Sequence, residues 1–252
     1  MINYLTKLDN SSGKLDILIG KNDDGISKII DLSRIGHMMI SGTTGSGKTN
    51  FLFNLICSLL YKHTNDIELL IVDLKQIDFI YFNGVKCCYK EKVITHNFQL
   101  EEMMMHLEEE YYTRKKLLSK NNFNTFKNII LIVDEYVELI YLIDKLGFRK
   151  RMEKLLKNIS SHGQDLGIHL ILASQCFRKE YLKSTIKKNI NCKISFRVGS
   201  FYDSKIFIGK SGAEKLKAPG DMLFLYEEHL ERIKCPFYKD TEILTFLQNY
   251  KS

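Results

Sequence analysis

The sequence has few of the residues that break regular structure or that cross-link a small fold. Its 252 residues include two prolines, no tryptophan and no low-complexity tract, a composition that argues against a disordered chain. The six cysteines form no CxxC pair and have no histidines at metal-ligand spacing. We therefore predict neither a disulfide framework nor a zinc site.

Long hydrophobic runs are also missing. The longest apolar runs, such as residues 129–133, are far too short to span a bilayer. The N-terminus lacks the basic-then-apolar arrangement of a signal peptide. We therefore expect a soluble, cytoplasmic chain. With 44% hydrophobic and 27% charged residues, the chain can bury one sizeable core, so one main domain is expected.

Positive charge exceeds negative charge, and it gathers in two stretches. The formal net charge of +7 suits a polyanionic partner, but it can equally reflect a compositional bias toward lysine. The stretches contain Lys145, Arg149, Lys150, Arg151, Lys154 and Lys157, and then Arg178, Lys179, Lys183, Lys187, Lys188 and Lys193. Solvated helix faces explain this pattern as well as a nucleic-acid surface does.

Short apolar segments alternate with helical segments, the pattern of an α/β fold with a mainly parallel sheet covered on both faces. Strands are expected at 37–41, 68–73, 92–95, 129–133, 168–173, 193–198 and 222–225. Helices are expected at 48–61, 100–119, 147–161, 179–189, 204–208 and within 238–250. Residues 15–32 predict a hairpin around a polar KNDDG turn. We expect a small N-terminal hairpin domain at 1–35 and the main domain at 36–252.

The clearest motif is GTTGSGKT at residues 42–49, between an expected strand and an expected helix. This order is the context that a phosphate-binding loop requires, because the glycines turn backbone N–H groups toward the phosphates at a helix N-terminus. Lys48 is placed to reach the β- and γ-phosphates, and the Thr49 hydroxyl to bind Mg²⁺. The expected nucleotide-binding residues are Gly42, Thr43, Thr44, Gly45, Ser46, Gly47, Lys48, Thr49 and Asn50.

A second motif, IILIVDE at 129–135, places two acids after five apolar residues. The acids should lie at the carboxyl end of a buried strand, where α/β sheets bind ligands. We predict that Asp134 holds the metal and that Glu135 is the general base, although a helix N-cap is the alternative interpretation. A further strand, IHLILASQ, ends in Ser174 and Gln175, which could contact the γ-phosphate or cap the strand. Together the motifs predict an ATPase that uses ATP and Mg²⁺.

Beyond these motifs, the chain resembles the FtsK/SpoIIIE family of hexameric DNA-pumping ATPases. The resemblance is carried by LDILIGKNDDG, HMMISGTTGSGKTN, LLIVDLK, IILIVDEYVEL, GIHLILASQ, NINCKISFRVGSFYDSKIFIG and SGAEKLKAPGDMLFL. It implies a RecA-like P-loop NTPase core and a homo-oligomeric, hexameric ring with nucleotide between subunits. It also implies duplex DNA in a central pore and a γ-phosphate-sensing role for Gln175.

In such a ring, an arginine from the neighbouring subunit can neutralise charge on the transferred phosphate. We predict Arg197, in SFRVGS, for this role. Gln164 stands where many family members carry a basic residue, so that position supplies no arginine here. The other candidates are Arg149, Arg151 and Arg178.

The resemblance also favours pore contacts for the two basic stretches. Lysine and arginine there would grip phosphates without reading bases, so binding would weaken with salt and ignore sequence. The expected DNA-binding residues are Lys150, Arg151, Arg178, Lys179, Lys187 and Lys188.

Three functions follow from these patterns. The first is an ATP-driven double-stranded DNA translocase for conjugative transfer, segregation or packaging of plasmid or phage DNA, recruited by an unidentified protein. The second is a type VII-like protein-secretion ATPase, against which the absence of membrane segments and tandem ATPase domains counts. The third is a ring in which ATP controls assembly and is turned over slowly.

Overall fold

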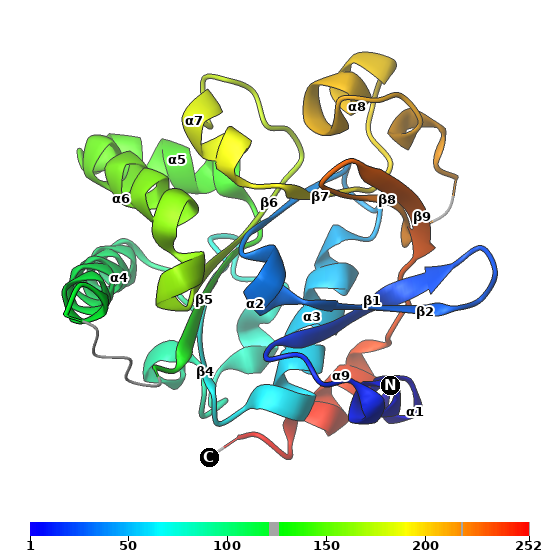
Figure 1. Ribbon diagram of the computed structural model, residues 1–252, viewed down its shortest axis with the longest axis horizontal. Helices are drawn as coiled ribbons and strands as arrows, with labels where there is room; N and C mark the ends of the chain where they lie inside the picture. Colours follow the sequence, from blue (N-terminus) through cyan, green and yellow to red (C-terminus); the bar gives the residue numbers. More distant parts are fainter. Residues whose placement is uncertain (121–125, 218, 252) are drawn as a thin grey trace.

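A nine-stranded sheet organises the residues that the computed structural model describes, namely 1–120, 126–217 and 219–251 (Figure 1). Its strand order is β2-β1-β9-β8-β7-β3-β6-β5-β4. The strands are β1 Asp16–Asn22, β2 Ser27–Asp31, β3 Met38–Ser41, β4 Ile67–Val72, β5 Asn128–Val133, β6 Ile168–Ser174, β7 Cys192–Ser195, β8 Asp221–Tyr226 and β9 His229–Lys234. Ser252, the last residue of the predicted main domain, lies outside the described residues.

The sheet combines a parallel part with an antiparallel extension. Strands β7, β3, β6, β5 and β4 pair in parallel, and β8, β9, β1 and β2 continue the sheet with antiparallel pairs. The parallel strands are almost continuously apolar because both of their faces are covered. The expected α/β class is confirmed.

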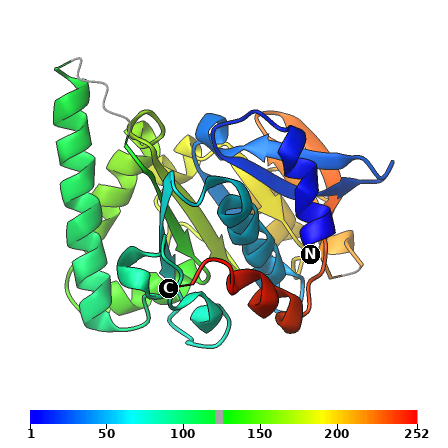
Figure 2. The ribbon, with the colours of Figure 1, turned by 90° about the horizontal axis from the view of Figure 1, so that it is seen from below.

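Helices cover both faces of the sheet (Figure 2). They are α1 Ile2–Leu5, α2 Leu32–Ile35, α3 Lys48–His63, α4 Asn97–Leu118, α5 Tyr136–Lys145, α6 Arg149–His162, α7 Ser184–Asn189, α8 Phe201–Ile208 and α9 Asp240–Leu247. Successive residues of β4 point to opposite faces, so Leu69 joins the core under α3 and Leu70 joins the core under α4, α5 and α6. The sheet is therefore the middle of three layers.

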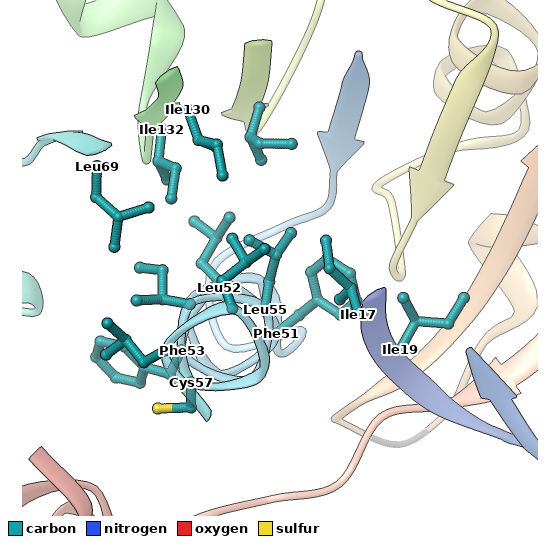
Figure 3. Close-up of a cluster of buried hydrophobic side chains, with 14 of the residues drawn as sticks. Ile17, Ile19, Phe51, Leu52, Phe53, Leu55, Cys57, Leu69, Ile130 and Ile132 are labelled. Carbon is teal, nitrogen blue, oxygen red and sulfur yellow. The ribbon is translucent and has the colours of Figure 1, made fainter. Parts of the chain in front are cut away.

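Helix α3 forms the centre of one core. Figure 3 shows Leu52 and Leu55 of this helix facing Ile130 and Ile132 from β5. All four side chains are fully buried. This packing fixes the N-terminus of α3, and with it the loop that precedes the helix, against the carboxyl ends of the parallel strands.

The N-terminal hairpin, β1 and β2, joins the same sheet through β9. Gly20 permits this contact, because a Cβ atom at that position would lie only 2.5 Å from the carbonyl oxygen of Lys234. Ile17 of β1 packs in the same core as α3. The hairpin thus shares both sheet and core with the rest, whereas the division into domains at 1–35 and 36–252 stays a prediction.

The structure corrects several predicted elements. Residues 92–95 are not a strand, because Ile94 makes only an isolated bridge to Val72 and the next residues turn into α4, where Gln99 caps the backbone N–H of His96. The predicted helix at 179–189 begins only at Ser184. Helix α5 and strand β9 were not predicted. In β9, a mostly exposed strand, only Ile233 is buried, so its hydrophobic signal is weak.

Two buried histidines join the start of β3 to β6. The Nδ1 atom of His169 lies 2.7 Å from the carbonyl oxygen of Gly36, and Nδ1 of His37 accepts the backbone N–H of Leu170 at 3.1 Å. Burial, together with the nearby His169, lowers the pKa of His37 to about 3. Burial also lowers the pKa of His169 to about 4. Both rings are therefore neutral in the folded protein near neutral pH.

We expect acid to destabilise the protein through this pair. Below pH 6.5, the ordinary histidine pKa, the unfolded chain binds protons that the folded chain does not. The free energy of unfolding should therefore fall by up to about 1.4 kcal/mol per pH unit for each histidine, down to about pH 4 for His169 and about pH 3 for His37. Urea unfolding between pH 7.5 and 4.5 measures this slope. His169→Gln should reduce it, the exposed His229→Gln should not, and equal slopes in all three proteins would contradict the assignment.

Candidate functional site

A cavity of about 310 Å³ lies where the parallel strands end. β3 leads into the loop at residues 42–47, and α3 begins at Lys48. Of the nine predicted nucleotide-binding residues, seven line the cavity, and Gly42 and Ser46 do not. The other walls come from the loops after β4, β5 and β6, from the turn before β8 and from the segment after β9.

At Gly47 of the loop, both the backbone angle and a close backbone contact require glycine. Gly47 has a φ of +111°, and a Cβ atom there would lie 2.6 Å from the backbone nitrogen of Gly220. Gly220 in turn donates its N–H to the carbonyl oxygen of Ser46 at 2.9 Å. The turn before β8 therefore packs directly on the loop and holds it in shape.

Lys48 is buried at the base of the loop. Its Nζ atom donates to the carbonyl oxygens of Gly42, at 2.5 Å, and Thr43, at 3.4 Å. Burial lowers the pKa of Lys48, while the nearby carboxylates of Glu135 and Asp134 oppose the shift. A further anion at the loop would stabilise the charged amine, so the site suits phosphate.

Asp134 and Glu135 follow β5 and line the same cavity as Lys48 and Thr49. Burial raises the pKa of Asp134 to about 6, and the neighbouring Asp78 adds to the rise. The Thr49 hydroxyl and the Asp134 carboxylate are the hard oxygen donors that Mg²⁺ prefers. A divalent cation between them would also offset the crowded negative charge, so these residues fit the predicted metal.

The carboxylate of Glu135 is oriented by the end of β6. The Ser174 hydroxyl donates to Oε1 of Glu135, and the backbone N–H of Gln175 donates to the same oxygen at 3.2 Å. The Gln175 side chain is exposed in the cavity. The two polar residues at the end of this strand thus hold the candidate base, and the sequence had suggested only a phosphate contact or a strand cap for them.

The loop after β4 adds charged groups to the site. Asp73 accepts backbone N–H groups from Lys75, Gln76 and Phe79 at 3.0–3.1 Å and so fixes this turn. Burial disfavours the charged form of Lys75. Oε1 of Glu138 lies 3.4 Å from the Lys75 Nζ, and together with the other acids of the site it outweighs burial, so the pKa of Lys75 is raised. Lys75 and Asp78 line the cavity.

Asp78 was not predicted from the sequence. Asp73 and Lys75 were noted only as part of LLIVDLK, one of the segments that carry the family resemblance. The sequence could have predicted all three, because they lie at the end of an expected parallel strand or follow it. β4 is the parallel neighbour of β5, and the residues after the two strands therefore lie at the same edge of the sheet.

The chain has relatives among known proteins. The model of the FtsK/SpoIIIE family matches residues 5–128. The DNA translocase FtsK of Clostridium acetobutylicum is 30% identical over 253 residues, which cover 93% of this chain and 32% of that protein. The DNA translocase FtsK of Borreliella burgdorferi is 29% identical, with coverage of 94% and 32%. The chain belongs to the FtsK/SpoIIIE family. It spans about a third of the length of these relatives.

Solved structures confirm the P-loop ATPase fold of this FtsK/SpoIIIE chain. The pCW3 conjugation coupling protein TcpA, in a monomer form with ATPγS, has a TM-score of 0.81 at 22% identity and covers 99% of this chain and 73% of that one. The cytoplasmic domain of the Thermomonospora curvata type VII secretion ATPase EccC has a TM-score of 0.73 at 22% identity, and the match covers 95% of this chain and 31% of that one.

None of the helices in residues 1–120, 126–217 and 219–251 is long and apolar enough to cross a bilayer.

The candidate arginines of this FtsK/SpoIIIE chain differ in their availability. The carbonyl oxygen of Arg197 accepts the backbone N–H of Thr43 at 2.8 Å, and the Arg197 side chain is exposed beside the loop. Arg149 is bound to Glu153 at 3.0 Å, and Arg151 to Glu108 at 2.5 Å. Arg178 is exposed. Gln164 instead donates to the carbonyl oxygens of Ser33 and Arg34 in α2.

The predicted DNA-binding residues also differ in whether their side chains already have a partner within the chain. Nζ of Lys187 donates to the carbonyl oxygen of Ile206 at 2.5 Å, which ties α7 to α8 at the top of Figure 1. Burial, with Lys193 nearby, lowers the pKa of Lys187. Arg151 is held by Glu108. The remaining four predicted residues are exposed to solvent: Lys150, Arg178, Lys179 and Lys188.

Proposed function

We propose that this FtsK/SpoIIIE protein is an ATPase that moves double-stranded DNA. The observation that carries the proposal is the cavity that brings Lys48, Thr49, Asp134 and Glu135 together. It occurs in a chain that is about 30% identical to curated DNA translocases over 93% of its length. The cavity supports ATP turnover, and the relatives support DNA as the material that is moved.

The roles of the residues follow from their positions. Loop N–H groups and Lys48 hold the β- and γ-phosphates, while Thr49 and Asp134 hold Mg²⁺. The metal, when bound, neutralises phosphate charge. Glu135, held by Ser174, accepts a proton from the attacking water, and Gln175 lies where it can contact the γ-phosphate.

DNA binding is assigned to the exposed cations. Arg178 and Lys179 follow β6, whose end holds Glu135, so a change at the phosphate can reach them through a short segment of chain. Their charges, with those of Lys150 and Lys188, would contact phosphates of the duplex without reading its sequence. Arg151 and Lys187 already have partners within the chain, so we give them a smaller share of the contact.

The proposed assembly is a hexameric homo-oligomeric ring in the cytoplasm. Arg197 of one subunit would complete the site of its neighbour. A recruiting protein and a role in conjugative transfer, segregation or packaging complete the proposal. The type VII secretion ATPase shares the fold at only 22% identity, so its cargo carries no weight here. A ring with slow turnover remains the other alternative.

Duplex-stimulated ATP hydrolysis is the experiment that tests this function. Long duplex DNA should raise the turnover rate, and the affinity for duplex should fall by about a hundredfold between about 50 and 200 mM salt if roughly four phosphates are contacted. Replacing Arg178, Lys179 and Lys188 together by alanine should abolish the stimulation. A matched alanine triple at the exposed Lys14, Lys21 and Lys120 should keep it. A turnover rate that ignores duplex at every salt concentration would refute the translocase.

A further inference from the structure

The nucleotide cavity has a second end that lies away from the acids. Along the sheet, β6 and β5 lie on one side of β3, and β7, β8 and β9 lie on the other. Asp134, Glu135 and Gln175 line the cavity on the first side. Gly220, before β8, and Phe237, after β9, line it on the second. The loop that follows β3 therefore separates a hydrolytic end from an end with an aromatic wall.

Phe237 leaves a large apolar side chain in water. It is 76% exposed, although it lines the cavity. Exposed single aromatics are common on surfaces, so exposure alone assigns no role. What distinguishes Phe237 is that the backbone on both sides of it is fixed.

Asn50 provides this fixation. Its Nδ2 atom donates to the carbonyl oxygen of Pro236 at 2.5 Å, and its Oδ1 accepts the backbone N–H of Tyr238 at 3.0 Å. The Tyr238 hydroxyl also donates to Asn54, one turn further along α3, at 3.1 Å. The segment between β9 and α9 is thereby attached to the first two turns of α3 (Figure 1).

The position of this clamp relates Phe237 to the phosphates. Asn50 comes two residues after Lys48, so the residue that holds Phe237 belongs to the helical turn that follows the phosphate loop. Asn50 also lines the cavity, and its contact with the nucleotide stays a prediction. Its amide binds the backbone of residues 236 and 238. Asn50 therefore holds the backbone on both sides of Phe237.

We propose that Phe237 is the base-stacking residue of this site and that Asn50 positions it. The proposal rests on the function of the cavity as an ATP site. With the γ-phosphate at the hydrolytic end, the base extends toward β8 and β9 and lies on the ring of Phe237. Aromatic stacking works on any base but favours the larger purine ring system, so the preferred ligands are purine nucleoside triphosphates.

The test compares two ligands that share phosphates but differ in the base. Binding of a non-hydrolysable ATP analogue and of inorganic tripolyphosphate, each with Mg²⁺, is measured by calorimetry. Phe237→Ala should weaken the ATP analogue about tenfold and leave tripolyphosphate unchanged. Phe237→Tyr should restore the affinity, and Tyr202→Ala, which removes an aromatic that is 75% exposed elsewhere, should have no effect.

The role of Asn50 has its own readout. Asn50→Ala should lower the affinity for the ATP analogue relative to that for the CTP analogue. In a Phe237→Ala background, Asn50→Ala should cause no further loss of affinity for the ATP analogue, because the two residues act through one contact. Additive losses would overturn the positioning role.

Three results would overturn the stacking role. Unchanged ATP affinity in Phe237→Ala would exclude stacking, and equal weakening of both ligands would show a displaced loop instead. If the parent protein binds neither the ATP analogue nor tripolyphosphate, the proposed ATPase function and this inference are both refuted. The first two results leave the ATPase function standing.

Discussion

Glu135→Gln is expected to retain ATP binding and to lose hydrolysis by at least about a hundredfold. The amide keeps the shape of the side chain and can still accept the hydrogen bonds from Ser174 and the Gln175 backbone. It cannot accept a proton from water. Calorimetry with ATP and a phosphate-release assay measure the two effects separately.

Two further variants place this result in context. Lys48→Ala should weaken both binding and hydrolysis, because the phosphate contact that we propose for this buried amine is made in the ground state as well. Glu228→Gln, in the exposed turn between β8 and β9, should behave like the parent protein. Normal turnover by the Glu135 variant would show that the base lies elsewhere.

The second large effect is expected at Arg197. If its guanidinium completes the site of the next subunit, Arg197→Ala should slow hydrolysis by about a thousandfold while ATP binding persists. The exposed side chain beside the phosphate loop supports this choice over Arg149 and Arg151, which are ion-paired within the chain. Phosphate release by the assembled protein is the measurement.

Mixing experiments decide whether the arginine acts between subunits. Arg197→Ala subunits keep Glu135, and Glu135→Gln subunits keep Arg197, so mixed assemblies contain some complete sites and should regain activity. Arg34→Ala, which removes an arginine that is 86% exposed, is the control and should be active alone. Absence of rescue at every mixing ratio would contradict an arginine that acts in trans.

Much of the fold follows from local sequence. The parallel strands β3, β4, β5 and β6 were predicted because each is a short apolar run next to an expected helical segment. Strand β9 was not predicted, because its pairing with β1 and β8, rather than a pattern of apolar residues, defines it as a strand. Residues 92–95 looked like a strand for the opposite reason: their apolar pair, Val93 and Ile94, is buried without forming a ladder.

The sequence by itself determined the phosphate loop and the acids of β5. These depend on residues adjacent in the chain, where a strand, a glycine loop and a helix N-terminus follow one another within a few residues. The tertiary structure decided which other groups line the cavity. Asn50 and Pro236 are 186 residues apart. They meet because β9 pairs with β8, so the segment that follows β9 lies against the first turn of α3. Likewise, the ion pair between Arg151 of α6 and Glu108 of α4 depends on how these two helices pack, which no local pattern reveals.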